Sequence, residues 1–259
     1  ARATDNSGAT TTSAPVTVTV TAATDGVTLL LQRGLNSYAG ASDTFIDRYV
    51  PSGIRGANAT LYLYSSDQVP LVRFAVFQSE GGPVPDGAVI QSAKLGLYKQ
   101  YYDASLSLKA LLRPWVEGQA TWNNASTGAA WAVAGAAGAG TDYEAVADAT
   151  VAAAFSPGWV EFDVTSRLQR WSGGLATNNG WRLTTTGGGN AKQFYSSEYA
   201  TDPSLRPKLT IVYSATGLNA RPTVSLTALA DGAGFIAPAQ IALSAAATDS
   251  DGTIASVEF

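Results

Sequence analysis

The chain has 259 residues, 46% of them hydrophobic, which is enough for at least one packed domain. Its net charge of −4 and its content of only 14% charged residues exclude the basic surface that nucleic acids and anionic membranes attract. Cysteine and histidine are both absent, which excludes disulfides, thiolate metal sites and catalysis by a histidine base. Because of this charge balance, we expect no nucleic-acid partner. Because no apolar run reaches the length of a membrane span, we also expect no membrane insertion.

The two ends of the chain have the patterns of short β-strands. In residues 1–22 a turn is expected at 5–8, followed by a strand in which Val16, Val18 and Val20 alternate with threonine. Residues 222–259 show further short strands and follow a linker at residues 215–221.

Both ends contain segments that resemble bacterial immunoglobulin-like repeats of secreted proteins. Ala1-Arg-Ala-Thr-Asp-Asn-Ser-Gly resembles the closing hairpin of such a repeat. Ala247-Thr-Asp-Ser-Asp-Gly-Thr-Ile-Ala-Ser-Val-Glu-Phe, with Pro222-Thr-Val-Ser-Leu before it, resembles the opening strands. An immunoglobulin-like domain needs roughly 100 residues, so we expect each end to be an incomplete, partial module.

The middle of the chain, residues 27–214, has the pattern of an all-β domain. Short segments rich in alternating apolar residues are separated by Gly, Pro, Asn and Asp. The segments expected to be strands are 27–32, 43–47, 60–64, 71–77, 88–98, 105–112, 158–164, 180–185, 193–197 and 208–213. This pattern predicts an antiparallel β-sandwich or jelly roll.

One short helix is expected at residues 165–171. Asp163 or Thr165 can accept hydrogen bonds from its first free N–H groups, and Leu168 and Trp171 lie on the same side. Two glycines at 173–174 end the helix, which we expect to close one end of the sandwich.

Tryptophans are expected to fix the long loops. Trp115 and Trp122 flank a charged turn, and each combines a large apolar ring with one N–H donor, a combination that favours burial beneath a loop. The Ala/Gly-rich stretch 125–154 has weak strand patterning and is longer than most loops. We expect it to wrap the surface and to be held there by Trp131 and Tyr143.

The middle domain also resembles a known family. The resemblance rests on Trp115-Val-Glu-Gly-Gln-Ala-Thr-Trp-Asn-Asn and Phe162-Asp-Val-Thr, supported by Asp43-Thr-Phe-Ile-Asp, Ser92-Ala-Lys-Leu-Gly-Leu-Tyr and Ser196-Ser-Glu followed by Arg206-Pro-Lys-Leu. These motifs resemble the DNRLRE-type family, which includes bacterial modules that bind alginate and related acidic polysaccharides. The resemblance implies a β-jelly roll and polysaccharide binding without catalysis; it carries over no ligand-contact residues.

Candidate sugar-binding residues follow from residue type. Sugars are recognised by exposed aromatic rings next to cationic or amide side chains. The turn around Tyr101 and Tyr102 offers such rings, because adjacent residues of a strand point to opposite faces. Two further candidate clusters are Tyr38 and Tyr49 with Arg48 and Arg55, and Tyr195 or Tyr199 with Lys192.

Calcium is the metal that this composition allows, through carboxylate and backbone oxygens. The sequence suggests two places for it: Asp249 and Asp251, in an Asp-Ser-Asp-Gly segment, and Asp43 and Asp47, four residues apart. No other cofactor is expected.

An enzyme is the less favoured class. A glycosidase needs two carboxyl groups on either side of one sugar bond. The available acids are Asp103, Glu117, Glu161, Asp163 and Glu198. Structural roles explain them without catalysis: Glu117 lies in a turn, Asp163 lies near a helix start, and Glu198 is expected beside Arg206. A lyase remains an alternative through tyrosine and arginine, and the lack of histidine disfavours it.

We therefore expect a non-catalytic module of a modular extracellular or cell-surface bacterial protein, which binds polysaccharide and serves adhesion. The alternative is a structural repeat of an extracellular fibre or sheath. In that case the incomplete end modules would pair with identical copies by strand addition.

Overall fold

The computed structural model describes residues 2–4, 7–12, 26–186, 189–214, 223–228, 234, 236, 242–248, 254 and 256–257. The chain divides into two compact units, one of residues 26–215 and the other of both ends, 1–25 and 216–259. Within the described residues, no helix combines the length and the apolar character that crossing a membrane requires.

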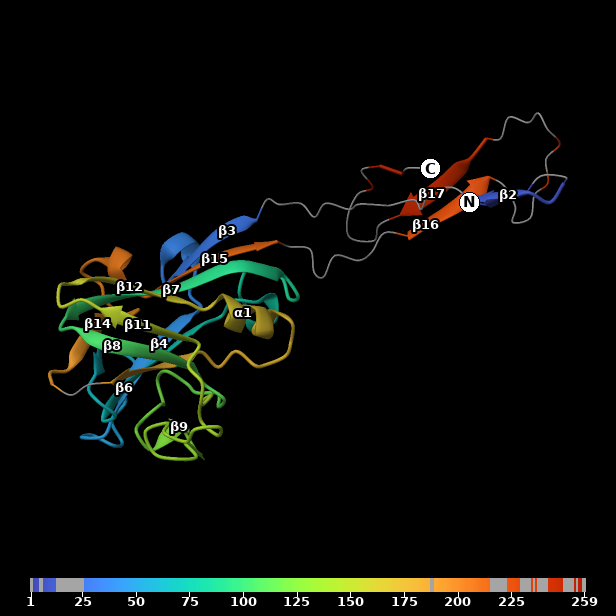
Figure 1. The fold of residues 1–259 in the computed structure, drawn as a ribbon. Helices are drawn as coiled ribbons and strands as arrows, with labels where there is room; N and C mark the ends of the chain where they lie inside the picture. The colour runs from blue at the N-terminus through green and yellow to red at the C-terminus, as the bar shows by residue number, and fades with distance from the viewer. Residues whose placement is uncertain are drawn as a thin grey trace. The chain divides into compact units, whose positions relative to one another are not determined.

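The larger unit is a sandwich of two antiparallel sheets, as expected from the sequence (Figure 1). The five-stranded sheet has the order β11 (Ala149–Ala153), β8 (Ala104–Ala110), β13 (Trp181–Thr186), β6 (Gln68–Phe74) and β4 (Ala41–Asp47). The six-stranded sheet has the order β3 (Val27–Gln32), β15 (Lys208–Ser214), β7 (Val89–Tyr101), β14 (Lys192–Tyr195) and β5 (Thr60–Leu63), and β12 (Gly158–Asp163) pairs with β7.

All ten segments expected to be strands in this unit form strands. Residues 125–154 were expected to form a loop with weak strand patterning. This was wrong for the last part of the segment, because residues 149–153 form β11 and pair with β8. Two short strands, β9 (Asn124–Ser126) and β10 (Ala129–Ala130), also lie in or beside this stretch. Alanine and glycine carry little strand signal of their own, so the pairing with β8 decides the structure of β11. Three 3-10 turns, η1 (Leu35–Ser37), η2 (Gln78–Glu80) and η3 (Pro203–Leu205), complete the unit.

The main core lies between the two sheets. Leu95 and Leu97 of β7 are fully buried, together with Phe162, Phe194 and Leu209 of the neighbouring strands. Each such side chain contributes roughly 1.5–3 kcal/mol through burial. Because successive residues of a strand alternate between its faces, Lys94, Gly96 and Tyr98 of β7 lie on the outer face of the six-stranded sheet.

A second core covers the β4 and β6 part of the outer face of the five-stranded sheet. Ile46, Val69 and Leu71 of β4 and β6 pack against Trp115 and Trp131 from residues 111–147, which we call the covering loop. β4 and β6 are therefore buried on both faces. The indole of Trp115 donates to the Asn179 carbonyl at 2.9 Å and that of Trp131 to the Thr121 carbonyl at 3.0 Å, so these rings hold the loop as expected. Trp122 and Tyr143 are partly buried against the same cluster.

A buried carboxylate organises the covering loop. Asp142 is 0% exposed. It accepts hydrogen bonds from the N–H groups of Ala132 at 2.7 Å and of Val133 and Gly138 at 2.9 Å. Arg113 neutralises it, with Nε 3.0 Å from Oδ1. One side chain thus accepts hydrogen bonds from backbone N–H groups that have no strand partner in this Ala/Gly-rich loop.

The α-helix of the larger unit, α1 (Thr165–Ser172), begins and ends close to the expected residues. Asp163 accepts from the Thr165 N–H at 3.0 Å, and Leu168 and Trp171 are buried in the main core. The Ser172 hydroxyl donates to the Ala88 carbonyl at 2.6 Å, which fixes the helix beside the beginning of β7 (Figure 1).

The unit made of the two ends contains two described hairpins. β1 (Arg2–Thr4) pairs with β2 (Thr10–Thr12), and β16 (Thr223–Ala228) pairs with β17 (Ser244–Thr248), both antiparallel. The strand expected around Val16, Val18 and Val20 and the linker at 215–221 lie outside the described residues.

Because β7 has one buried and one outer face, substitutions on the two faces should lower the free energy of unfolding by different amounts. Leu97→Ala should lower the free energy of unfolding by about 2–5 kcal/mol, because it leaves a cavity between the sheets. Lys94→Ala on the outer face should change it by about 0.5 kcal/mol or less. Urea denaturation measures both; equal losses would mean that the inner face of β7 is not core.

Candidate functional site

The outer face of the six-stranded sheet carries a row of aromatic side chains, which we call the aromatic surface. Its centre is Tyr98 of β7, whose ring centroid lies 5.4 Å from that of Trp159 and 5.8 Å from that of Tyr195. Trp159 comes from β12 and Tyr195 from β14, on either side of β7. Tyr199 extends the row by stacking on Tyr195 at 3.7 Å. All four rings are partly exposed.

A β-bulge adds Tyr101 to this row. In the pairing of β7 with β14, Lys99 faces Phe194 and Tyr101 faces Gln193, so Gln100 is an extra residue. Strict alternation would turn Tyr101 inward, and the bulge turns it to the same face as its partner Gln193. Tyr101 is 54% exposed and adds an accessible ring to the surface.

The turn after β7 carries two more aromatic rings. Tyr102 has a φ of 64° and lies between the rings of Tyr101, at 6.2 Å, and Phe155, at 6.0 Å. Phe155 is 67% exposed. Beneath this turn the Lys99 ammonium donates to the carbonyls of Phe155 and Ser156 at 3.2 and 3.1 Å, so a buried cation holds the Phe155 loop in place.

Lys192, expected to act beside Tyr199, is 5% exposed. It lines a hollow of about 360 Å³ together with Asp103, Ser105 and Thr186, next to the turn after β7. Its burial leaves little of the side chain for a surface ligand.

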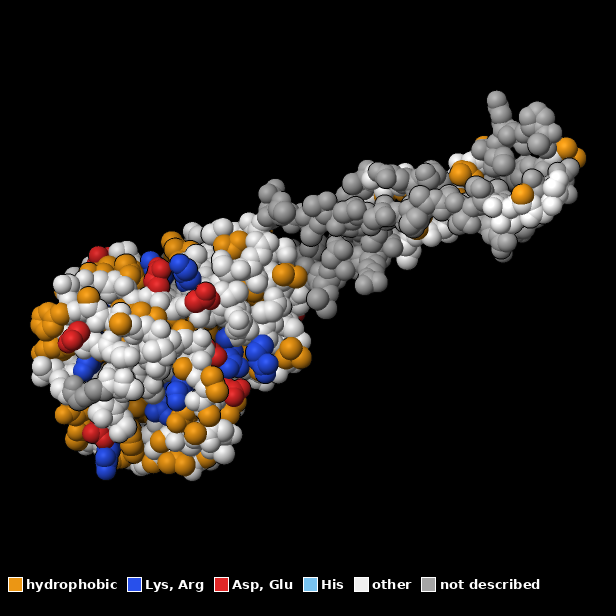
Figure 2. Space-filling view, in the orientation of Figure 1, with side chains coloured by type: hydrophobic (Ala, Val, Ile, Leu, Met, Phe, Trp, Pro, Cys, Tyr) orange, Lys and Arg blue, Asp and Glu red, His pale blue; other side chains and the backbone are white. Residues whose placement is uncertain are grey.

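Lys208 is a cation of the aromatic surface, beside Trp159. Its ammonium lies 3.8 Å from the centroid of the Trp159 ring. The two side chains meet above Gly96, where a Cβ would lie 3.0 Å from Lys208 Cε and 3.2 Å from Trp159 Cε3. Nearby, Lys94 pairs with Glu161 at 3.8 Å. Figure 2 shows acidic and basic side chains intermixed on the visible face of the larger unit, without a continuous basic area.

A hydrogen bond between two tyrosines of this surface raises the pKa of Tyr195. The pKa of Tyr195 is raised to about 12, mainly by its hydrogen bond with Tyr199 and to a smaller extent by burial. At neutral pH the Tyr195 hydroxyl is therefore a neutral group that can donate to a ligand oxygen. The backbone carbonyl of Tyr199 accepts from Arg206 Nε at 2.7 Å, which fixes the turn that carries the ring.

The Tyr49 and Arg55 cluster lies on the loop after β4. Tyr49 is 64% exposed, and its hydroxyl donates to Asp67 at 3.3 Å. Arg55 pairs with the buried Asp47 at 3.1 Å, so the cation is already neutralised. No ring contact or hydrogen bond found in the described residues joins this cluster to the aromatic surface.

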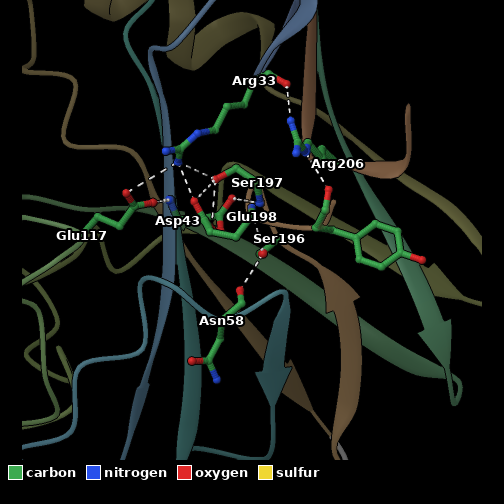
Figure 3. A network of polar contacts seen from close by, with 9 residues as sticks. Arg33, Asp43, Asn58, Glu117, Ser196, Ser197, Glu198 and Arg206 are labelled. Carbon is green, nitrogen blue, oxygen red and sulfur yellow. Dashed lines mark hydrogen bonds and ion pairs between the residues drawn. The ribbon is translucent and has the colours of Figure 1, made fainter. Parts of the chain in front are cut away.

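A second site is a cluster of three carboxylates, from Asp43 of β4, Glu117 of the covering loop and Glu198 after β14 (Figure 3). One oxygen from each lies within 4.8 Å of the others. Arg33 approaches from the end of β3, with Nη1 2.5 Å from Glu198 Oε1 and 3.7 Å from Glu117 Oε2. We refer to the three acids as the carboxylate cluster.

Asp43 is the innermost member of the carboxylate cluster, at 1% exposure. Its Oδ2 accepts from the Ser197 N–H at 2.8 Å, and its own N–H donates to Glu117 at 2.7 Å. Its Oδ1 is buried with no donor within reach. Burial is the main cause that raises the pKa of Asp43, and the negative charge of Glu198 raises it further. The hydrogen bond from Ser197 lowers it in part. Burial also raises the pKa of Glu117.

The structure places Asp43 and Asp47, one of the two expected metal pairs, apart from each other. Asp43 and Asp47 are four residues apart on one strand, roughly 13 Å, too far for one ion. Asp47 is occupied by Arg55 and by the Tyr49 N–H at 3.0 Å. Asp43 instead meets Glu117 and Glu198, which the sequence analysis had considered only as catalytic acids. Asp249 and Asp251 lie outside the described residues.

Two carboxylates that line a surface hollow have partners in the fold. Glu161 and Asp163 line a hollow of about 670 Å³ beside β12. Glu161 pairs with Lys94, and hydrogen bonds from Thr165 lower the pKa of Asp163. A glycosidase acid needs a raised pKa. The acids with raised pKa, Asp43 and Glu117, line neither this hollow nor the one beside Lys192.

The pKa of Tyr195 provides a test of the aromatic row. Its phenol should titrate near 12 in the native protein, as read from the tyrosine Cζ resonance in ¹³C NMR. Tyr199→Phe should move this pKa back toward the ordinary value of about 10, because the first cause of the shift is lost. An unchanged pKa in Tyr199→Phe would mean that the two hydroxyls do not interact.

Comparison with known protein families gives matches for residues 36–213 and 222–259. The family model of carbohydrate-binding module family 96 matches residues 36–213, and that of a bacterial Ig domain matches residues 222–259. No curated protein matches the chain. The first match covers more than half of the sequence and spans nearly the whole sandwich. The chain therefore belongs to carbohydrate-binding module family 96.

Proposed function

We propose that the aromatic surface binds a polysaccharide chain and that the protein does so without cleaving it. The observation that carries the proposal is the row of aromatic side chains across the outer face of the six-stranded sheet. The covering loop packs over β4 and β6 on the outer face of the other sheet, whereas the outer face of the six-stranded sheet presents partly exposed aromatic rings. Membership of a carbohydrate-binding family supports the same conclusion.

The rings would contribute in two ways. Tyr101 and Phe155 have accessible ring faces, on which the apolar face of a sugar can stack. The inner rings, Tyr98 and Tyr195, pack on their neighbours and so present ring edges and hydroxyls. These hydroxyls would bond to sugar oxygens. The row would hold several sugar units of one chain.

We further propose that the preferred ligand is an acidic polysaccharide. Lys208 has no carboxylate partner among the ion pairs of the described residues, and its ammonium lies over Trp159, one ring of the row. Its ammonium could pair with a uronate carboxylate while the sugar ring rests on the tyrosines. The resemblance of the sequence motifs to DNRLRE-type modules supports this choice.

The proposed setting is a modular extracellular or cell-surface protein that adheres to its glycan. In this organisation residues 27–214 form the binding domain, residues 215–221 a linker, and residues 1–22 and 222–259 parts of immunoglobulin-like spacers. Bacterial Ig domains are common in proteins of this type, and the match at residues 222–259 supports the arrangement. Pairing of identical copies through the end strands, in a fibre or sheath, remains the alternative.

Substitution of the exposed rings tests the location of the site. Tyr101→Ala and Phe155→Ala should each weaken polysaccharide binding about tenfold, which corresponds to losing about 1.4 kcal/mol of stacking. Tyr49→Ala removes an equally exposed tyrosine from a different loop and should leave affinity unchanged. Affinity electrophoresis against a panel of acidic and neutral polysaccharides provides the measurement. A loss in Tyr49→Ala alone would place the site at the loop after β4.

The charge of Lys208 tests the class of ligand. Lys208→Gln should reduce affinity for acidic polysaccharides about tenfold at low salt and leave neutral ones unaffected, because only the former offer a carboxylate to pair. Raising the salt to about 0.5 M should produce the same selective loss in the wild-type protein, since exposed charges are screened. Tighter binding of neutral glycans would contradict the acidic preference.

A further inference from the structure

The carboxylate cluster holds more negative charge than its protein partner neutralises. Asp43, Glu117 and Glu198 carry three negative charges when ionised, and Arg33 supplies one positive charge. Among the described residues, no ion pair joins Arg33 or any other cation to Asp43. Ionised acids that are buried this closely require a further positive charge or a proton.

The geometry favours a cation over a proton alone. Asp43 Oδ1 is buried without a donor, although its carboxylate faces the two glutamates (Figure 3). Calcium binds oxygen ligands at 2.3–2.6 Å, so two oxygens on one ion can be separated by up to about 5 Å. The three acids, with one oxygen each within 4.8 Å of the others, satisfy this limit. They come from three separate parts of the chain, which is typical of a site built by the fold.

We propose that Asp43, Glu117 and Glu198 bind one calcium ion, which fixes the turn of residues 196–199 against the sandwich. The side chains of Glu117 and Glu198 are 23% and 18% exposed, so an ion can enter from their side, and water can supply its remaining ligands. Arg33 is 38% exposed at its side chain and can turn toward solvent when the ion binds.

The site also connects to the aromatic surface. Ser197, whose N–H binds Asp43, lies two residues before Tyr199, the last ring of the row. The ion would hold Glu198 and thereby the backbone that carries Tyr199. This connection rests on the proposed function, whereas calcium binding itself does not.

Calcium titration of the whole chain by isothermal calorimetry, after removal of metals with a chelator, tests the proposal. The wild-type protein should bind one calcium ion saturably, and the ion should raise Tm by about 5–10 °C at a hundredfold excess over the Kd. Glu117→Gln should reduce the affinity at least tenfold. Glu161→Gln makes the same chemical change at an exposed site and should leave it unchanged. Asp43→Asn should abolish binding, and Glu117→Gln keeps the test decisive if Asp43→Asn does not fold.

Two further variants distinguish calcium binding at the carboxylate cluster from calcium binding elsewhere in the chain. Arg33→Gln removes the competing positive charge and should keep or tighten calcium binding severalfold. The double variant Asp249→Asn/Asp251→Asn should bind calcium like the wild type. Absence of saturable binding in both the wild type and Arg33→Gln overturns the proposal, as does binding that survives in Glu117→Gln and disappears in the double variant. Calcium binding with no polysaccharide binding would uphold the ion site and refute the proposed function alone.

Discussion

The unequal covering of the two sheets determines where this sandwich can meet a ligand. The covering loop packs Trp115 and Trp131 onto one outer face, and the buried carboxylate of Asp142 supplies acceptors for three of its backbone N–H groups. Burial on both faces makes β4 and β6 part of the scaffold. The six-stranded sheet keeps one face on the core and turns the other outward, which allows aromatic side chains to gather there.

Strand β7 connects the scaffold to the proposed site. Its leucines fill the core, and the same alternation places Tyr98 on the opposite face. The bulge at Gln100 then adds Tyr101 to that face. The carboxylate cluster supports the other end of the row, because Asp43 of the five-stranded sheet binds the turn that presents Tyr199. Both sheets therefore contribute to the position of the rings.

The sequence predicted the fold well and the site only in part. Alternating apolar residues located every strand of the sandwich except β11, whose alanines carry almost no pattern and depend on pairing with β8. Tyr101, Tyr102 and either Tyr195 or Tyr199 were proposed from their residue type. Alternation across Leu95 and Leu97 could also have identified Tyr98 as outward-facing.

The remaining features depend on tertiary structure. The row formed by Trp159, Tyr98 and Tyr195 arises from the order of β12, β7 and β14 in the sheet, and the sequence contains no signal for that order. The burial of Lys192 and the meeting of Asp43 with Glu117 and Glu198 have the same origin. The most direct test of the account is an amide NMR titration of the protein with acidic oligosaccharides. The account predicts the largest shifts at residues 98–102, 158–160 and 193–199; shifts confined to the covering loop or to residues 48–55 would contradict it.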